Sequence, residues 1–237
     1  IIFKGFLIVQ KFQKFIITTQ NITGTWFVMW KFDDNIAPNF VEHARKHIPN
    51  YDKVIDKTTS VCNRLCRKDD PIIDVGCATG ETLRRLEASN FTNLYGVDNS
   101  TSMIKHCDTN AMIYLGNKLP TLISYKVIIL NWTLHFIKEK SDYLEHCSKR
   151  LQEDGFIILS DKTSKDSFLI DRYHDFKRDC GVSEDEIIGK QQAVEDMMYI
   201  DDVNWYFDQG KKLSFDVDII DADFCFTTFL YRKKTHD

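Results

Sequence analysis

The feature that most constrains this fold is a regular alternation of short apolar runs and helical patterns from residue 71 onward. Strands are predicted over 71–75, 92–97, 111–115, 125–131 and 155–160, and helices over 80–89, 101–107 and 138–151. Two β-rich runs, 214–221 and 223–231, lie almost end to end and predict an antiparallel pair. Strands that alternate with helices form a parallel sheet covered on both faces. We therefore expect an α/β fold, a doubly wound, mostly parallel seven-stranded sheet with a C-terminal antiparallel strand pair.

Helical segments flank this alternation on both sides. Before it, 37–48 and 52–68 have helical spacing, and after it a polar helical stretch runs from about 166 to 210. Residues 1–28 read differently, because they are rich in Ile and Phe but are interrupted by lysines, and the first Met of the chain is Met29. We expect 1–28 to be an upstream extension that the fold does not need, and 29–237 to form a single domain.

The segment PIIDVGCATG, residues 71–80, leaves the first strand through a glycine-containing loop. After Asp74 and Val75, Gly76 and Gly80 allow the backbone to pass close to a ligand before the next helix begins. In a parallel sheet, ligands bind outside the carboxyl ends of the strands, where a helix N-terminus favours polar or anionic groups. The next strand ends in Asp98, whose carboxylate can accept hydrogen bonds from both hydroxyls of a ribose. This pattern predicts a nucleoside site.

The spacing of the loop helps to choose the nucleoside. Gly76 and Gly80 form G-x-x-x-G, whereas a nicotinamide dinucleotide favours G-x-G-x-x-G, and here Ala78 follows Cys77. Asp74 places a carboxylate beside the loop, which disfavours a pyrophosphate and suits a cationic nucleoside. S-adenosylmethionine, which carries a sulfonium and an amino acid, meets both conditions. The alternative is a tight strand-to-helix turn that binds no ligand.

Longer segments of the chain resemble a known family. They are WKFDDNIAPNF, IPNYDKVID, DVGCATG, GVDNSTSMI, LNWTLHFI, FIILSDK and YHDFKRDCGVSEDEIIGKQQAVEDMM. Through them the chain is similar, over about residues 30–231, to the class I S-adenosylmethionine-dependent methyltransferases, and within that superfamily it resembles the carboxy-S-adenosylmethionine synthases. DVGCATG is shared across the superfamily, whereas HDFKRDCGVSEDEI and YDKVI are more specific to the synthase branch.

This resemblance implies a Rossmann-like methyltransferase fold with S-adenosylmethionine, or its carboxylated form, as the cofactor. The synthases convert S-adenosylmethionine and prephenate into carboxy-S-adenosylmethionine, which is used in the modification of the tRNA wobble uridine. The resemblance also allows a homodimer, and it implies a small-molecule substrate.

Cofactor contacts carry over from the resemblance residue by residue. Together with Asp74, the predicted cofactor-binding residues are Tyr51, Gly76, Cys77, Ala78, Asp98, Asn99, Asn117, Lys118 and Asn131. Plain structural roles remain alternatives for several of them, with Tyr51 packing between helices, Cys77 filling a small buried space and Asn99 forming a turn. Asn131 closes an apolar strand, and an amide in that position favours a ligand or a capping role.

Three departures from the synthase pattern bear on function. The family has an acidic residue at the adenine position, where this chain has Asn117, and the segment from Met103 to Asn117 is shorter than the family leads us to expect. The synthases also place an arginine directly after the lysine that is Lys190 here, and it grips the extra carboxylate. This chain has Gln191 there, so Lys190 or Arg178 would have to supply the charge, and a lysine does not reproduce the arginine fork.

Three functions follow from these observations. The first is methyl transfer from S-adenosylmethionine to an unidentified acceptor, with the base drawn from His135, Tyr173, His174 or Asp175, and with Gln191 as a further candidate active-site residue. The second is a carboxy-S-adenosylmethionine synthase that uses another cation. The third is a cofactor-binding protein without catalysis.

Charge, hydropathy and cysteine content indicate which partners and which cellular compartment the chain has. The net charge of −4 offers no basic field for nucleic acid, and no apolar run approaches the ~20 residues of a membrane span. The seven cysteines are odd in number and form no C-x-x-C pair, so we expect free thiols in a reducing, cytoplasmic setting and no metal site.

Overall fold

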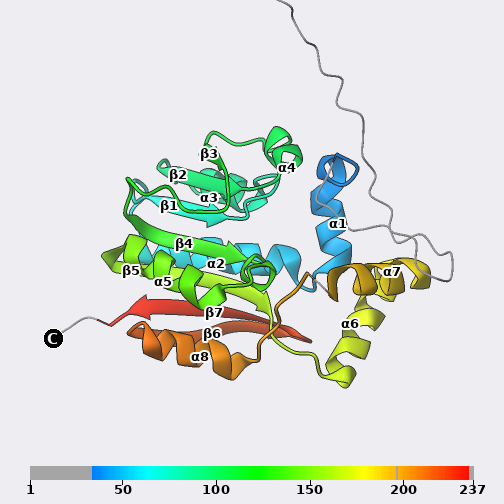
Figure 1. The fold of residues 1–237 in the computed structure, drawn as a ribbon. Coiled ribbons are helices and arrows are strands. Elements are labelled where there is room, and N and C mark those ends of the chain that lie inside the picture. Colours follow the sequence, from blue (N-terminus) through cyan, green and yellow to red (C-terminus); the bar gives the residue numbers. More distant parts are fainter. Residues whose placement is uncertain (1–33, 196, 235–237) are drawn as a thin grey trace, which may run out of the picture.

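A computed structural model describes residues 34–195 and 197–234, so the predicted extension over 1–28 lies outside the described residues. Seven strands form one sheet in the order β3-β2-β1-β4-β5-β7-β6 (Figure 1). Their bounds are β1 (Ile72–Val75), β2 (Leu94–Asp98), β3 (Met112–Leu115), β4 (Tyr125–Asn131), β5 (Leu151–Lys162), β6 (Phe215–Asp223) and β7 (Phe226–Lys233). Strands β1 to β5 pair in parallel, and β7 runs antiparallel to both β5 and β6. The predicted mostly parallel sheet with a final antiparallel pair is confirmed.

Eight α-helices surround the sheet in the described part of the chain. They are α1 (Phe40–His47), α2 (Tyr51–Leu65), α3 (Glu81–Ala88), α4 (Thr101–Lys105), α5 (Lys140–Arg150), α6 (Ser167–Asp179), α7 (Glu184–Glu195) and α8 (Val203–Lys212), with short 3-10 turns at Ala37–Asn39 and Leu134–Phe136. The predicted polar stretch over 166–210 therefore consists of three helices. The first break falls at Gly181, whose φ of +79° is the left-handed conformation that glycine adopts easily.

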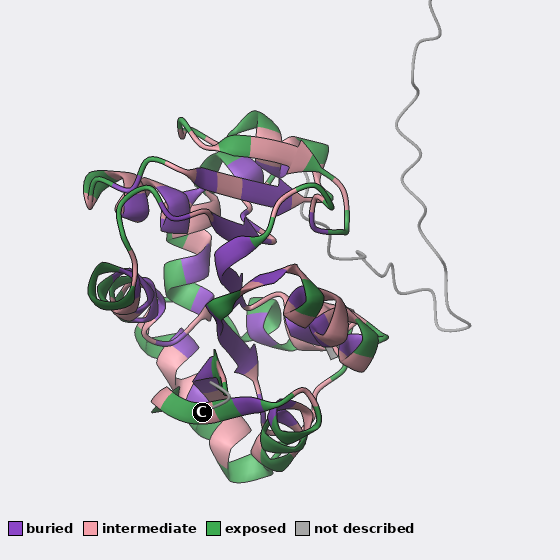
Figure 2. Cartoon of the chain, turned by 90° about the vertical axis from the view of Figure 1, so that its left-hand side faces the viewer, coloured by how far each residue is buried: buried purple, intermediate pink, exposed green. Residues whose placement is uncertain are grey.

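The sheet separates two apolar layers. Figure 2 shows that its central strands are mostly buried. On one face, Leu144 of α5 and Tyr206 of α8 pack with side chains such as Ile73 of β1. On the other face, Cys62 of α2 and Leu83 of α3 pack with side chains of β1, β4 and β5. Because side chains alternate along a strand, an apolar run such as β4, buried at all seven positions, supplies both layers.

Helices α1, α6 and α7 lie together beyond the carboxyl ends of the parallel strands (Figure 1). After β3, the chain crosses back to place β4 beside β1, so the winding of the sheet reverses between these two strands. In doubly wound sheets, ligands bind outside the sheet at this reversal. The three helices therefore form a roof over the edge of the sheet where a ligand site is expected.

Candidate active site

One large cavity of about 1450 Å³ opens at the carboxyl ends of β1, β2 and β4. All ten predicted cofactor-binding residues line it: Tyr51, Asp74, Gly76, Cys77, Ala78, Asp98, Asn99, Asn117, Lys118 and Asn131. The candidates for catalysis, His135, Tyr173, His174 and Gln191, line it as well. The fold thus brings predicted site residues from Tyr51 to Gln191 together at one site.

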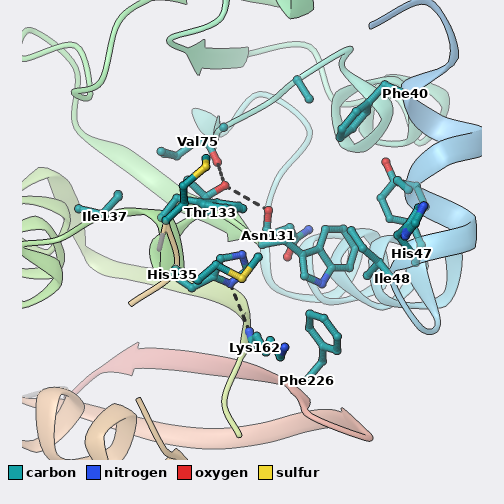
Figure 3. Close-up of a pocket in the computed structure, with 18 of the residues that line it drawn as sticks. Phe40, His47, Ile48, Val75, Asn131, Thr133, His135, Ile137, Lys162 and Phe226 are labelled. Carbon is teal, nitrogen blue, oxygen red and sulfur yellow. Dashed lines mark hydrogen bonds between the residues drawn. The ribbon is translucent and has the colours of Figure 1, made fainter. Parts of the chain in front are cut away.

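The loop after β1 is shaped by its two glycines. Gly76 and Gly80 have φ values of +71° and +83°, which strongly favour glycine. A Cβ on Gly76 would also lie 2.3 Å from Oγ1 of Thr133, which itself donates a hydrogen bond to the Val75 carbonyl at 2.8 Å (Figure 3). The loop therefore passes through a space that a side chain would block, and its backbone faces the cavity.

Asp98 ties this loop to the end of β2. Its Oδ2 accepts a hydrogen bond from the Ala78 backbone N–H at 2.9 Å, and its Oδ1 accepts one from Ser100 at 2.8 Å. Burial raises the pKa of the Asp98 carboxyl, and the backbone N–H groups of Ser100, Ala78 and Asn99 oppose that rise. The carboxylate therefore stands at the cavity wall with its orientation fixed by backbone donors, and its contact with a ribose stays a prediction.

Asp74 has a different character from the one the sequence suggested. Its side chain is almost completely buried, and this burial raises the pKa of its carboxyl well above the usual range. Burial therefore favours the neutral form, and Asp74 is a weak source of the negative charge expected of it. Glu81, at the start of α3, lines the same end of the cavity and is the more exposed carboxylate, although it also pairs with Arg84 and Arg85.

Tyr51 meets an aromatic partner that sequence reasoning missed. The ring of Tyr51 stacks on that of Trp132, with centroids 5.0 Å apart and planes at 24°. Trp132 follows β4 with a φ of +55°, which is uncommon for a residue with a side chain of this size. Its backbone N–H donates a hydrogen bond to the Ser160 carbonyl at 2.6 Å. Both rings line the cavity, so an aromatic wall stands beside the glycine loop.

Asn131, at the end of β4, is held mainly by the protein itself. Its Oδ1 accepts a hydrogen bond from the Ser160 hydroxyl at 2.9 Å, and its Nδ2 lies 3.5 Å from the Thr58 hydroxyl oxygen. The side chain therefore joins β4 to β5 and α2, while one edge reaches the cavity (Figure 3). These contacts are with other side chains and do not cap a backbone group, and the contact of Asn131 with the cofactor stays a prediction.

His135 belongs to a buried polar group behind the cavity wall. Its Nδ1 lies 2.6 Å from Oδ1 of Asp161, and the other oxygen of Asp161 accepts a hydrogen bond from the Tyr206 hydroxyl at 2.8 Å. The Lys162 backbone N–H also points at Nδ1, at the longer distance of 3.2 Å (Figure 3). The Lys162 N–H needs a lone pair on Nδ1, whereas the Asp161 carboxylate needs a proton there, so these two contacts make opposite demands on this nitrogen.

The other predicted bases are less suited to proton removal. The Tyr173 hydroxyl donates to the His47 carbonyl at 2.7 Å, and burial raises the pKa of this phenol. Burial and three neighbouring cations lower the pKa of His174. Asp175 does not line the cavity and pairs with Arg172 and Arg178.

Five lysines line the cavity, and no arginine of the described residues does. Lys177 and Lys190 belong to the roof helices α6 and α7, Lys162 ends β5, Lys165 lies between β5 and α6, and Lys118 lies at the other end beside Asn117. Burial and the charge of Lys177 lower the pKa of Lys190 to about 7, and burial and Lys162 lower the pKa of Lys177 to about 8. Arg178, the other cation considered as a substitute for the arginine of the synthases, does not line the cavity and pairs with Glu184 at 2.8 Å.

This fold and site define a class I S-adenosylmethionine-dependent transferase. A family model described as a methyltransferase domain matches residues 43–211, and the chain belongs to that family. The family implies binding of S-adenosylmethionine. In the described part of the chain, no helix is both long enough and apolar enough to cross a bilayer.

Curated relatives narrow the likeness further. The chain is similar to a carboxy-S-adenosyl-L-methionine synthase of Colwellia psychrerythraea, with 30% identity over 73% of this chain and 79% of the relative. A synthase of the same name from Shewanella sediminis is 29% identical over 78% of this chain and 85% of its own length. These values confirm the resemblance to the synthase branch.

The fold is also found among solved methyltransferases. The magnesium protoporphyrin IX methyltransferase of Synechocystis, solved with bound S-adenosylhomocysteine (SAH), superposes with a TM-score of 0.59. Its sequence is 14% identical, and the match covers 85% of this chain and 97% of that structure. This likeness concerns the fold alone.

Proposed function

We propose that this chain binds S-adenosylmethionine at the glycine loop and transfers its methyl group to a small anionic acceptor held under α6 and α7. The observation that carries this proposal is the distribution of charge along the large cavity. Asp98 and Glu81 stand at the end formed by β1 and β2, where Lys118 also lines the wall, and Lys162, Lys165, Lys177 and Lys190 line the opposite end, although burial lowers the pKa of Lys177 and Lys190. Such a gradient favours a cationic sulfonium at one end and an anion at the other.

In this reaction the main task of the protein is to align the acceptor with the methyl group of S-adenosylmethionine. The S–CH₃ bond breaks as the acceptor attacks the methyl carbon, the electron pair returns to sulfur, and S-adenosylhomocysteine leaves. If the attacking atom carries a proton, we assign its removal to Nε2 of His135, with the ring proton on Nδ1 facing Asp161, a tautomer that requires the Lys162 N–H to turn away from Nδ1. In this proposal His135 is the catalytic base and Asp161 is its positioning residue.

A second candidate is the carboxy-S-adenosylmethionine synthase activity. It is favoured by the relatives, which bear that name over most of this chain. Against it stands Gln191 at the cavity wall, together with the lack of any arginine there among the described residues. Lys177 and Lys190 supply positive charge, but their lowered pKa values reduce it near neutral pH.

The test uses S-adenosylmethionine with a deuterated methyl group and a pool of small metabolites separated by anion exchange. We expect the label to appear in a retained, anionic product, to disappear with His135→Asn, and to persist with His106→Asn, a change to an exposed histidine. Mass spectrometry of the molecule that copurifies with the protein is expected to show S-adenosylmethionine or S-adenosylhomocysteine. Label found only in unretained products, or a copurified carboxylated cofactor, would refute the proposal.

A further inference from the structure

A second, smaller cavity lies beside the large one, at the junction of α1 with α7. It measures about 300 Å³, and its wall includes His43 and His47 of α1 and Glu186 of α7. We propose that these three side chains form a binding site for a divalent transition metal ion of the zinc type. The proposal rests on these contacts alone and is independent of the proposed methyl transfer.

The geometry suits three ligands of one ion. His43 and His47 are separated by one helical turn, so their rings lie on the same face of α1 with centroids 4.1 Å apart. Nε2 of His47 is 3.1 Å from Oε1 of Glu186, and ligand atoms from all three residues lie within 4.8 Å of one another. Tetrahedral zinc with bonds of ~2.0–2.1 Å places its ligand atoms about 3.4 Å apart, so the widest pair must close by roughly 1.4 Å.

The ring of His47 is only partly satisfied by hydrogen bonds within the protein. His47 is 3% exposed, and its Nδ1 is buried without a hydrogen-bond partner. Buried polar atoms normally have a partner, and exchanging the two ring nitrogens by a flip would leave the other one unpaired. The only hydrogen bond described for this ring reaches a carboxylate, which is itself a zinc ligand.

The site is open to solvent on the side of Glu186. The Glu186 side chain is 48% exposed, so it can adjust its position and an ion can enter past it. Histidine and carboxylate ligands suit zinc, and three protein ligands leave a fourth position for water. The pattern was visible in the sequence as H-x-x-x-H over 43–47, but its third ligand comes from 139 residues further along the chain.

Lys190 is the side chain that most strongly opposes metal binding at this site. Its Nζ lies 2.6 Å from Nε2 of His43, where it already places a donor on that lone pair. A metal that takes this nitrogen must displace Lys190, and the repulsion weakens the site relative to one without lysines. Because His43, His47 and Lys190 also line the large cavity, an ion here would join α1 to α7 and move a lysine of the roof.

The experiment titrates the metal-free full chain with Co²⁺, followed by absorption, and with Zn²⁺, followed by calorimetry. We expect one equivalent to bind with the visible spectrum of nitrogen and oxygen ligands. Glu186→Gln, His43→Asn and His47→Gln are each expected to weaken binding about tenfold or more, as loss of a ligand requires. The matched controls, Glu184→Gln on the same helix and His106→Gln directly after α4, are expected to bind like the parent.

Thermal unfolding gives a second readout, because an ion that binds only the folded chain raises its Tm. We expect Zn²⁺ to raise the Tm of the parent and of Glu184→Gln but not that of Glu186→Gln, which changes an exposed side chain and leaves the core intact. The proposal is overturned if no equivalent binds, if Glu186→Gln and His43→Asn bind like the parent, or if the Co²⁺ spectrum shows thiolate ligands from the cysteines.

Discussion

Nδ1 of His135 lies 2.6 Å from Oδ1 of Asp161, and both side chains are almost completely buried. The second oxygen of Asp161 accepts a hydrogen bond from the Tyr206 hydroxyl at 2.8 Å. These contacts fix the orientation of the histidine at the cavity wall. They join the 3-10 turn after β4, the end of β5 and α8 into one polar group.

Removing the Tyr206 hydroxyl tests how far this group stabilises the fold. Tyr206→Phe leaves Oδ2 of Asp161 buried without its donor, which is expected to lower the free energy of unfolding by about 1–3 kcal/mol in urea denaturation. Tyr143→Phe is the matched control, because the Tyr143 hydroxyl is buried and has no partner. That change is expected to be neutral or stabilising. Equal losses in the two variants would contradict the arrangement.

The second prediction concerns Asp98 and the cofactor. Asp98→Ala removes the acceptor proposed for the ribose hydroxyls and the two backbone contacts that hold the loop. A charge-assisted hydrogen bond contributes about 1.5–3 kcal/mol, so the affinity for S-adenosylmethionine is expected to fall at least tenfold in calorimetry. Asp69→Ala, whose side chain is 82% exposed, should bind like the parent. If Asp98→Ala stays folded and binds equally well, the ribose assignment is wrong.

Local patterns in the sequence were enough for the strands and the glycine loop. The strand over 125–131 was predicted with its observed bounds, because the apolar run 127–130 at its centre, buried on both faces, is a strong signal. The strand predicted over 155–160 in fact begins at Leu151, where pairing of Leu151 with Tyr125 draws polar residues into the sheet. That pairing depends on the register between strands, which no local pattern reveals.

The same limit applies to the site. Gly76 and Asp98 were predictable because each is at the end of a recognisable strand. The contact of His135 with Asp161 spans 26 residues and depends on the parallel register that sets Asn131 beside Ser160. No local pattern predicted the position of Trp132, because its ring stacks on that of Tyr51 only through the turn that follows β4.

The third prediction concerns pH and the lysines of the roof. Burial lowers the pKa of Lys190 to about 7 from its ordinary value of 10.5, so the folded chain loses this proton before the unfolded chain does. Between these values the unfolded chain binds more protons, and the free energy of unfolding therefore rises with pH. Below pH 7 both states are protonated and the full cost of the buried charge remains.

We test this with the difference in unfolding free energy between the parent and Lys190→Met, measured from pH 7 to pH 10. The unfolding free energy of the parent is expected to rise relative to that of the variant by at most about 1.4 kcal/mol per pH unit. Lys149→Met, which changes a lysine whose side chain is 69% exposed, should show no such gain. A difference that stays flat or falls with pH would show that Lys190 keeps its proton in the folded chain.

The last prediction concerns Gln191 and decides between the two enzyme activities. Synthase chemistry must hold a second carboxylate on the carbon attached to sulfur, and the residue that follows Lys190 at the cavity wall is neutral. The parent is therefore expected to prefer S-adenosylmethionine over its carboxylated form, and to give no phenylpyruvate from S-adenosylmethionine and prephenate. Gln191→Arg supplies a two-pronged cationic donor, which should raise the relative affinity for the carboxylated cofactor by roughly tenfold to several hundredfold in competition binding. Gln192→Arg adds the same charge at an exposed neighbour and should change this ratio little. If the unchanged protein already prefers the carboxylated cofactor or forms phenylpyruvate, then lysines such as Lys190 have taken the role of the arginine, and the synthase activity replaces methyl transfer as the function of this site.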